Sequence, residues 1–262
     1  AFLMMELNNS NALIRIYSRM VSCSFIVLAV MSYFLFVDIK CGIVQTCFIA
    51  FYLFLFSTYQ SRASVGRVFY AFAMLGLASI YYVQILYFVP VIWVMMATNI
   101  MNGCARIYVA SLLGLLVPYW FAAGYYAFTD QLSLFDDHFA ALLCLDSQSV
   151  WLDVPLAQIL TIAFVALLAI VGMINFRLNN YRDKIRTRML FDFFSVMIVF
   201  TLIFMVFQPT NMHFLLAILI VSASPLIGHF ISLTNSLVTN LVFCLMLVAT
   251  LALTFCNVWI RF

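Results

Sequence analysis

Residues 154–175 have the sequence VPLAQILTIAFVALLAIVGMIN, which contains no charged side chain. A transmembrane α-helix needs about 20 consecutive apolar residues to cross the hydrocarbon core of a bilayer, so this segment predicts a membrane-spanning helix. The rest of the chain repeats the pattern, because 67% of its 262 residues are hydrophobic and only 8% are charged. A soluble domain is about 25% charged. Lipid therefore has to solvate much of this apolar surface.

The apolar stretches lack the alternation of polar and apolar residues that is typical of outer-membrane β-strands, so their backbone amides must pair within helices. We expect an all-α, polytopic transmembrane helix bundle that forms a single integral membrane domain over residues 1–262. Residues 1–19 predict a short amphipathic segment at the membrane surface, and no cleaved signal peptide is expected. The expected spans, about nine, are 20–37, 41–57, two short helices within 68–101 that turn near 86–90, 107–128, 154–175, 189–207, 213–233 and 237–258.

The distribution of Lys and Arg predicts the orientation, because these residues are retained on the cytoplasmic side. With nine spans and a cytoplasmic N-terminus, all of the 12 basic residues fall inside except Lys40 and Arg261. Eight spans would place the basic residues of 176–188 on the side opposite Arg62 and Arg67. We therefore expect a multi-pass protein of a bacterial inner (plasma) membrane with its C-terminus outside.

The segment 129–153 is acidic and contains no Lys or Arg, and its apolar residues recur at helical spacing. This pattern predicts an amphipathic helix on the outer surface of the membrane. Within it, Asp136, Asp137 and His138 are chemically suited to bind a divalent ion or to act as acid and base. Successive helical residues point about 100° apart, however, so a solvated helix face is the favoured interpretation.

The loop between the sixth and seventh expected spans is basic. Anionic lipid headgroups or an acidic partner are its candidate ligands, although membrane orientation alone also requires such a loop. Asp192 follows Arg188 by one helical turn, which predicts an ion pair between them. The basic residues are Arg177, Arg182, Lys184, Arg186 and Arg188.

His229 lies inside the eighth expected span, where an ionisable side chain is costly and marks a candidate functional site. A polar seam along one side of this helix would face a cavity, or its members would bond neighbouring helices. The same helix has a small-residue face, which predicts close packing against a helix of this bundle or of a partner. The seam comprises Ser222, Pro225, His229, Ser232 and Ser236, and the packing face comprises Ser224, Gly228 and Ser232.

Two motifs carry a family resemblance. Residues 106–120, RIYVASLLGLLVPYW, together with residues 183–188, DKIRTR, resemble an uncharacterised family of multi-pass inner-membrane proteins from gut and gliding bacteria. The resemblance covers the middle and C-terminal portions of the chain. It implies an inner-membrane location and no particular activity.

Three classes of function remain open. We expect a non-enzymatic membrane subunit of a cell-envelope or secretion assembly, with membrane lipids and other membrane subunits as partners. The alternatives are a transporter or lipid-handling protein that uses the seam around His229, and an intramembrane enzyme acting on a lipid-linked substrate through Asp136, Asp137 and His138. The seven cysteines form no close pair and the eight glycines no phosphate-binding loop, so no metal, cofactor or nucleic acid is expected.

Overall fold

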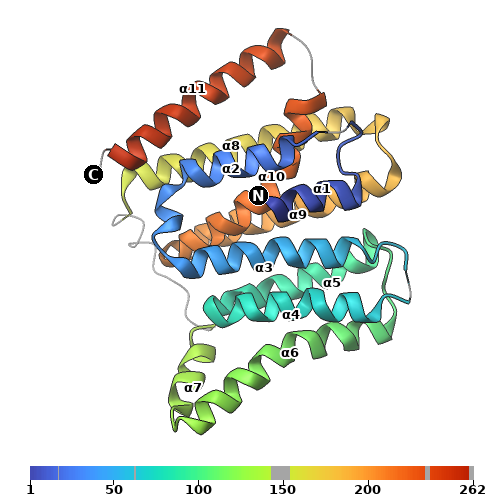
Figure 1. Ribbon diagram of the computed structural model, residues 1–262, viewed down its shortest axis with the longest axis vertical. Helices are drawn as coiled ribbons and strands as arrows, with labels where there is room; N and C mark the ends of the chain where they lie inside the picture. The colour runs from blue at the N-terminus through green and yellow to red at the C-terminus, as the bar shows by residue number, and fades with distance from the viewer. Residues whose placement is uncertain (17, 62, 143–153, 234–236, 260–262) are drawn as a thin grey trace. The chain divides into compact units, whose positions relative to one another are not determined.

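The computed structural model describes residues 1–16, 18–61, 63–142, 154–233 and 237–259 (Figure 1). Every regular element in these ranges is a helix. The α-helices are α1 (Phe2–Asn11), α2 (Met20–Met31), α3 (Ile39–Phe56), α4 (Val65–Tyr81), α5 (Phe88–Thr98), α6 (Ala105–Phe128), α7 (Leu132–Ala140), α8 (Leu156–Asn179), α9 (Ile185–Phe207), α10 (Met212–Leu233) and α11 (Leu237–Trp259). Short 3-10 helices are η1 (Tyr33–Phe36), η2 (Val83–Tyr87), η4 (Asn180–Arg182) and η5 (Pro209–Asn211).

Six helical segments of the described chain are long and apolar enough to cross a membrane: α3, α6, α8, α9, α10 with η5, and α11. The predicted class, all-helical with several membrane-capable helices, is therefore confirmed. The other three predicted spans coincide with shorter apolar helices, α2, α4 and the segment Val83–Thr98. These are shorter than the roughly 20 residues that a span needs, and the count of nine is not confirmed.

The predicted turn within 68–101 lies a few residues earlier than expected. Helix α4 ends at Tyr81, η2 follows, and α5 begins at Phe88. Pro90 lies in the first turn of α5, where a missing backbone N–H breaks no helical hydrogen bond. Proline thus begins a helix here rather than marking the turn itself, whereas Pro118 lies inside the continuous helix α6.

The chain folds into two compact units, Ala1–Gly42 with Ser147–Phe262, and Ile43–Asp146. In the first unit, α10 is the central helix and packs against α2, α8 and α9. Within the described residues, 89% of its membrane-capable stretch is buried, against 11% for that of α11. A helix that is apolar on all sides is suited to such a central position. The expectation of one membrane domain stays a prediction.

The small-residue face of α10 is covered by α2. A Cβ atom at Gly228 would lie 2.9 Å from the backbone of Val21, so only glycine permits this approach. One helical turn earlier, Ser24 Oγ donates a hydrogen bond to the carbonyl of Ser224 at 3.0 Å. Ser224 and Gly228 of the predicted packing face are therefore in contact with a helix of the same unit.

Helix α11 is attached to its unit mainly near its C-terminal end. Asn257 Nδ2 donates to the carbonyl of Met31 on α2 and to Thr161 Oγ1 on α8, both at 2.8 Å. Toward its N-terminal end α11 diverges from α2 and α8 (Figure 1), and Leu237 there is 90% exposed. The C-terminal end of α11 is thus bonded to α2 and α8, while its N-terminal end lies apart from them.

The second unit is built on aromatic contacts and on a close pair of helices. Phe51 of α3 lies 6.0 Å from Phe72 of α4 between ring centroids, and Phe48 lies 6.3 Å from Phe88 of α5. Helices α4 and α6 approach closely because a Cβ atom at Gly76 would lie 2.8 Å from the carbonyl oxygen of Leu115. Tertiary packing therefore fixes α4 and α6 side by side.

The predicted amphipathic helix of the acidic loop is present as α7. Its Phe135 and Phe139 rings lie 5.1 Å apart and contact Tyr126 and Tyr119 of α6. The apolar side of α7 is therefore turned toward α6, as helical periodicity predicts. Residues 143–153 of the same loop lie outside the described residues.

Candidate functional site

A buried carboxylate connects three parts of the first unit. Asp183 precedes α9, and its Oδ2 lies 3.0 Å from His229 Nε2 on α10. The other carboxylate oxygen, Oδ1, lies 3.2 Å from Nε of Arg15, which precedes α2. The side chains of Asp183 and His229 are 1% and 2% exposed. Three segments distant in sequence thus converge on one carboxylate.

The His229 ring is enclosed by aromatic side chains. Its centroid lies 5.0 Å from that of Phe191 and 5.3 Å from that of Phe176, both in edge-to-face geometry. Because a carboxylate only accepts hydrogen bonds, His229 Nε2 is the protonated nitrogen in this pair. The carboxylate therefore orients the ring between the two phenyl groups.

The basic loop is held against the N-terminal segment by further contacts. Arg186 donates to Asn11 Oδ1 at 2.9 Å, and Asn8 bridges the carbonyl of Ser18 and the amide of Ile14. Together with the ion pair between Arg15 and Asp183, these bonds fix residues 8–16 beside the start of α9. Part of the basic loop therefore has a structural role within the unit.

The other basic residues of the loop have different surroundings. Arg177 pairs with Asp192 at 3.6 Å, in place of the predicted pair with Arg188. The reason is that Arg177, at the end of α8, is brought beside α9 by the turn between them. Lys184 is exposed, and the side chain of Arg182 lies outside the described residues. Contact with anionic lipid or a partner stays a prediction for these residues.

The acidic outer-loop candidates do not lie together in one site. Asp136 and Asp137 are exposed, whereas His138 is half-buried with its ring 6.1 Å from that of Tyr119. Burial lowers the pKa of His138, and a backbone hydrogen bond with Ser79 opposes that shift. Among the described residues, no group of three or more His, Cys, Asp and Glu side chains is arranged to hold a metal ion.

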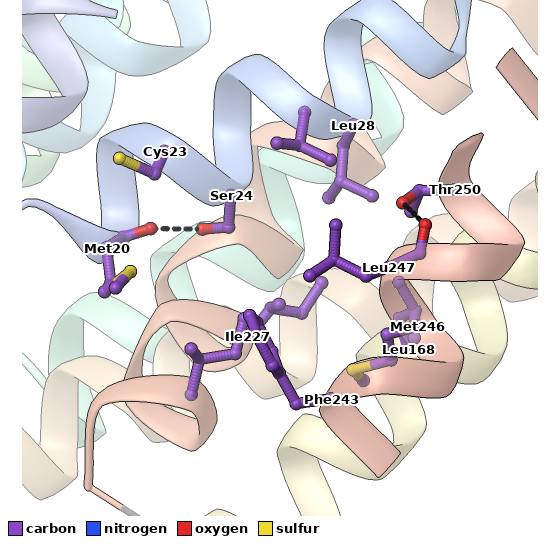
Figure 2. A pocket seen from close by; sticks show the side chains of 12 residues that line it. Met20, Cys23, Ser24, Leu28, Leu168, Ile227, Phe243, Met246, Leu247 and Thr250 are labelled. Atoms are coloured by element: carbon purple, nitrogen blue, oxygen red, sulfur yellow. Dashed lines mark hydrogen bonds between the residues drawn. The ribbon is translucent and has the colours of Figure 1, made fainter. Parts of the chain in front are cut away.

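A cavity of about 200 Å³ lies in the first unit between α2, α8, α10 and α11 (Figure 2). Its wall is apolar apart from Cys23, Ser24 and Thr250. Helix α2 supplies one face of the wall at helical spacing, and α11 supplies the facing side. The lining residues are Met20, Cys23, Ser24, Val27, Leu28, Leu168, Ile227, Ile231, Phe243, Met246, Leu247 and Thr250.

The two hydroxyl groups in this wall are already hydrogen-bonded to helix carbonyls. Ser24 Oγ lies 2.8 Å from the carbonyl oxygen of Met20 and 3.0 Å from that of Ser224, which compete for its single proton, and Thr250 Oγ1 donates to the carbonyl of Leu247 at 2.8 Å (Figure 2). Both hydroxyl protons are thus taken up by backbone carbonyls, and neither is directed at a ligand. The chemistry of the cavity therefore favours an apolar occupant.

The predicted seam around His229 lies apart from this cavity. Ser222 and Pro225 are buried in the unit, Ser232 Oγ donates to the carbonyl of His229 at 3.3 Å, and Ser236 lies outside the described residues. The cavity is lined by Ile227 and Ile231 of α10, which point away from His229 because two residues along a helix turn the side chain by about 200°. The seam's role as a ligand site stays untested.

Comparison with known proteins assigns this chain to no family and to no known fold. No family model matches the chain, and no significant similarity to a curated protein or a solved structure was found. The comparisons therefore lend no support to the resemblance carried by residues 106–120 and 183–188.

The sequence identifies His229 as a candidate site residue, but it does not identify Asp183 as its partner. Asp183 stands alone as an acid among five basic residues, and that isolation was the available signal that it pairs with a buried base. The cavity left no such signal, because Met20, Cys23 and Val27 resemble the other apolar residues of every span. Only the packing of α11 against α2 distinguishes them.

Replacing the buried imidazole is expected to destabilise the first unit. His229→Leu leaves the Asp183 carboxylate buried with Arg15 as its remaining partner, and the loss of a hydrogen bond to a charged group costs about 1.5–3 kcal/mol. We expect a clear fall in the melting temperature of the detergent-solubilised protein, measured by intrinsic fluorescence. Arg177→Gln is the matched control, since the exposed pair with Asp192 contributes about 0–1 kcal/mol. Equal melting temperatures for both variants would contradict this role of the pair.

Proposed function

We propose that this chain is a lipid-handling membrane protein that binds the hydrocarbon chain of a membrane lipid between α2 and α11. The observation that carries the proposal is the apolar cavity whose hydroxyl groups are hydrogen-bonded to backbone carbonyls. Its volume of about 200 Å³ exceeds that of a ~150 Å³ apolar protein cavity that binds benzene. A hydrocarbon chain fits both the size and the chemistry.

The driving force for such binding is packing. Lipid tails are as apolar as leucine, so a chain gains little hydrophobic free energy when it moves from the bilayer to the protein. A void, by contrast, deprives its lining atoms of dispersion contacts. A chain lying against Val27, Leu28 and Leu247 restores those contacts, which favours a bound lipid over an empty groove.

The proposed lipid site lies on the opposite side of α10 from the seam around His229, where the lipid-handling alternative had been expected to act. The buried pair of His229 and Asp183 then has a different role. It holds α10 and the N-terminal segment in place, so that the wall formed by α2 is fixed. The expected substrate class is a lipid with at least one long hydrocarbon chain.

A second candidate function is that of a non-enzymatic subunit of a cell-envelope or secretion assembly. The observation that favours it is the exposure of α11, of whose membrane-capable stretch 11% is buried. Exposed leucines continue along this helix at Leu237, Leu241 and Leu245. A helix of a partner membrane protein would pack there at the cost of displacing lipid.

We further propose a multi-pass location in a bacterial inner membrane, with nine spans, a cytoplasmic N-terminus and an external C-terminus. The positions of the three shorter apolar helices support the count, since they coincide with the remaining predicted spans. The distribution of Lys and Arg supports the orientation, because it places ten of the 12 basic residues on the cytoplasmic side. In this topology the ion pair of Arg15 with Asp183 lies at the cytoplasmic side.

Filling the cavity is expected to displace the lipid chain. Leu247→Trp places an indole ring against α2 in the space that the chain would occupy. In vesicles that contain a phospholipid with a photoreactive group near the end of its acyl chain, we expect labelling of α2 and α11 peptides to fall at least severalfold. The measurement is peptide mass spectrometry after irradiation.

The matched control is Leu245→Trp, on the same helix but outside the cavity lining, where the side chain is 60% exposed. This variant should keep the labelling of the unmodified protein. If both variants label equally, the chain does not occupy the cavity and the proposed function is wrong.

Partner binding through α11 predicts stable association. Extraction of the tagged chain from its native membrane in mild detergent should yield a complex larger than the monomer. Leu241→Ala combined with Leu245→Ala should reduce partner recovery severalfold, while Leu167→Ala on exposed α8 should not. Recovery of a monomer alone would exclude the second candidate.

The topology predicts opposite locations for the acidic and basic loops. Truncations after Asp130 and after Arg182, each fused to alkaline phosphatase or to green fluorescent protein, should differ in activity. The Asp130 fusion should give phosphatase activity outside, and the Arg182 fusion should fluoresce inside. The same location for both loops would contradict nine spans.

A further inference from the structure

The proposed chain-binding cavity has one tied end and one open end. At the tied end, Asn257 of α11 bonds both α2 and α8, close to Met31. At the other end the lining consists of Met20, Ile231 and Phe243, which belong to the first turn of α2, the last turn of α10 and the second turn of α11. Because α11 diverges in this direction (Figure 1), we expect a lipid to enter at this end.

Arg19 stands at the open end, in line with the cavity wall. The amide of Cys23 donates to the carbonyl of Arg19 at 3.0 Å, so Arg19 lies one helical turn before Cys23, and Val27 lies one turn after it. These three positions form a single stripe along α2. Arg19 is the N-cap residue of α2 and immediately precedes Met20 of the cavity lining. The residue is exposed.

The electrostatic surroundings favour a negative group beside Arg19. The four helices that line the cavity contain no Asp or Glu. The one acid of the nearby basic loop, Asp183, pairs with Arg15, and Asp192 of α9 pairs with Arg177. The N-terminus of α2 adds a partial positive charge at the same place. A phosphate held here would meet a guanidinium with planar, paired donors.

We propose that the lipid bound between α2 and α11 is an anionic phospholipid whose headgroup phosphate is held by Arg19 while its acyl chain lies in the cavity. This inference rests on the proposed function and specifies the ligand class. Arg19 acts as a specificity-determining residue: the cavity accepts any hydrocarbon chain, and the charge at its entrance selects the headgroup. The chain runs from Met20 toward Leu28, and Asn257 marks the tied end beyond it.

The test compares two photoreactive lipids with identical acyl chains, phosphatidylglycerol and phosphatidylcholine, each added to vesicles of phosphatidylcholine. We expect the unmodified protein to be labelled on α2 and α11 peptides about fivefold more by phosphatidylglycerol, the ratio that ~1 kcal/mol per basic residue gives. Arg19→Gln should bring the ratio close to one and keep the labelling by phosphatidylcholine. Arg19→Lys should retain part of the preference.

Arg106→Gln is the matched control, because it removes the same charge from an exposed residue at the start of α6, far from the cavity lining in sequence. A preference that survives in Arg19→Gln, or that falls equally in Arg106→Gln, would overturn the assignment of the headgroup to Arg19. Neither result would affect the proposed function. That function fails separately if Leu247→Trp leaves the labelling by both lipids unchanged.

Discussion

Burial of α10 on all sides is the constraint on which the first unit depends. A helix surrounded by other helices needs a different solution on each side: a glycine where α2 approaches, aliphatic side chains toward α8 and the cavity, and a partner for any ionisable group. Three consecutive residues meet these requirements: Ile227 lines the cavity, Gly228 lets α2 approach, and His229 bonds Asp183. Their proximity means that a change on one side of α10 is transmitted to the others.

The hydrogen bond of His229 with Asp183 satisfies the costliest of these requirements. An imidazole in an apolar span is stable when a hydrogen-bond acceptor reaches it, and here the acceptor comes from the turn between η4 and α9 rather than from a facing span. Arg15 then shares the carboxylate, so the N-terminal segment is attached to the same point. The cluster thus joins a surface segment to the central helix.

On the opposite side of α10 the packing is looser. Helix α11 is tied through Asn257 and diverges toward its other end, which leaves the cavity against α2. A bilayer tolerates this arrangement because lipid chains can fill a gap that water would not. Helix α10 is therefore packed tightly on the side of its small residues and loosely on the side of α11. The proposed lipid site lies on the loosely packed side.

The positions of most helices followed from the sequence, because hydrophobic length and the turn residues between apolar runs are local properties. The helix expected in the acidic loop followed from the 3.6-residue period in the same way. The turn before Pro90 was displaced by several residues, since proline restricts the residues around it without fixing where the preceding helix ends. The pairing of Arg188 with Asp192 was wrong, because a neighbour across a turn competed with the neighbour along the helix.

By itself the sequence determined that the chain is helical and apolar enough for a membrane, and that an ionisable His229 must find a partner. Tertiary structure alone decided that the partner is Asp183, that α2 covers the Gly228 face, and that a cavity lies beneath α11. The physical reason is that amphipathic period and hydrophobic length specify each helix separately. Which apolar surfaces come into contact depends on the shapes of side chains that are distant in sequence. Spans of nearly uniform hydrophobicity do not reveal these contacts in their sequence.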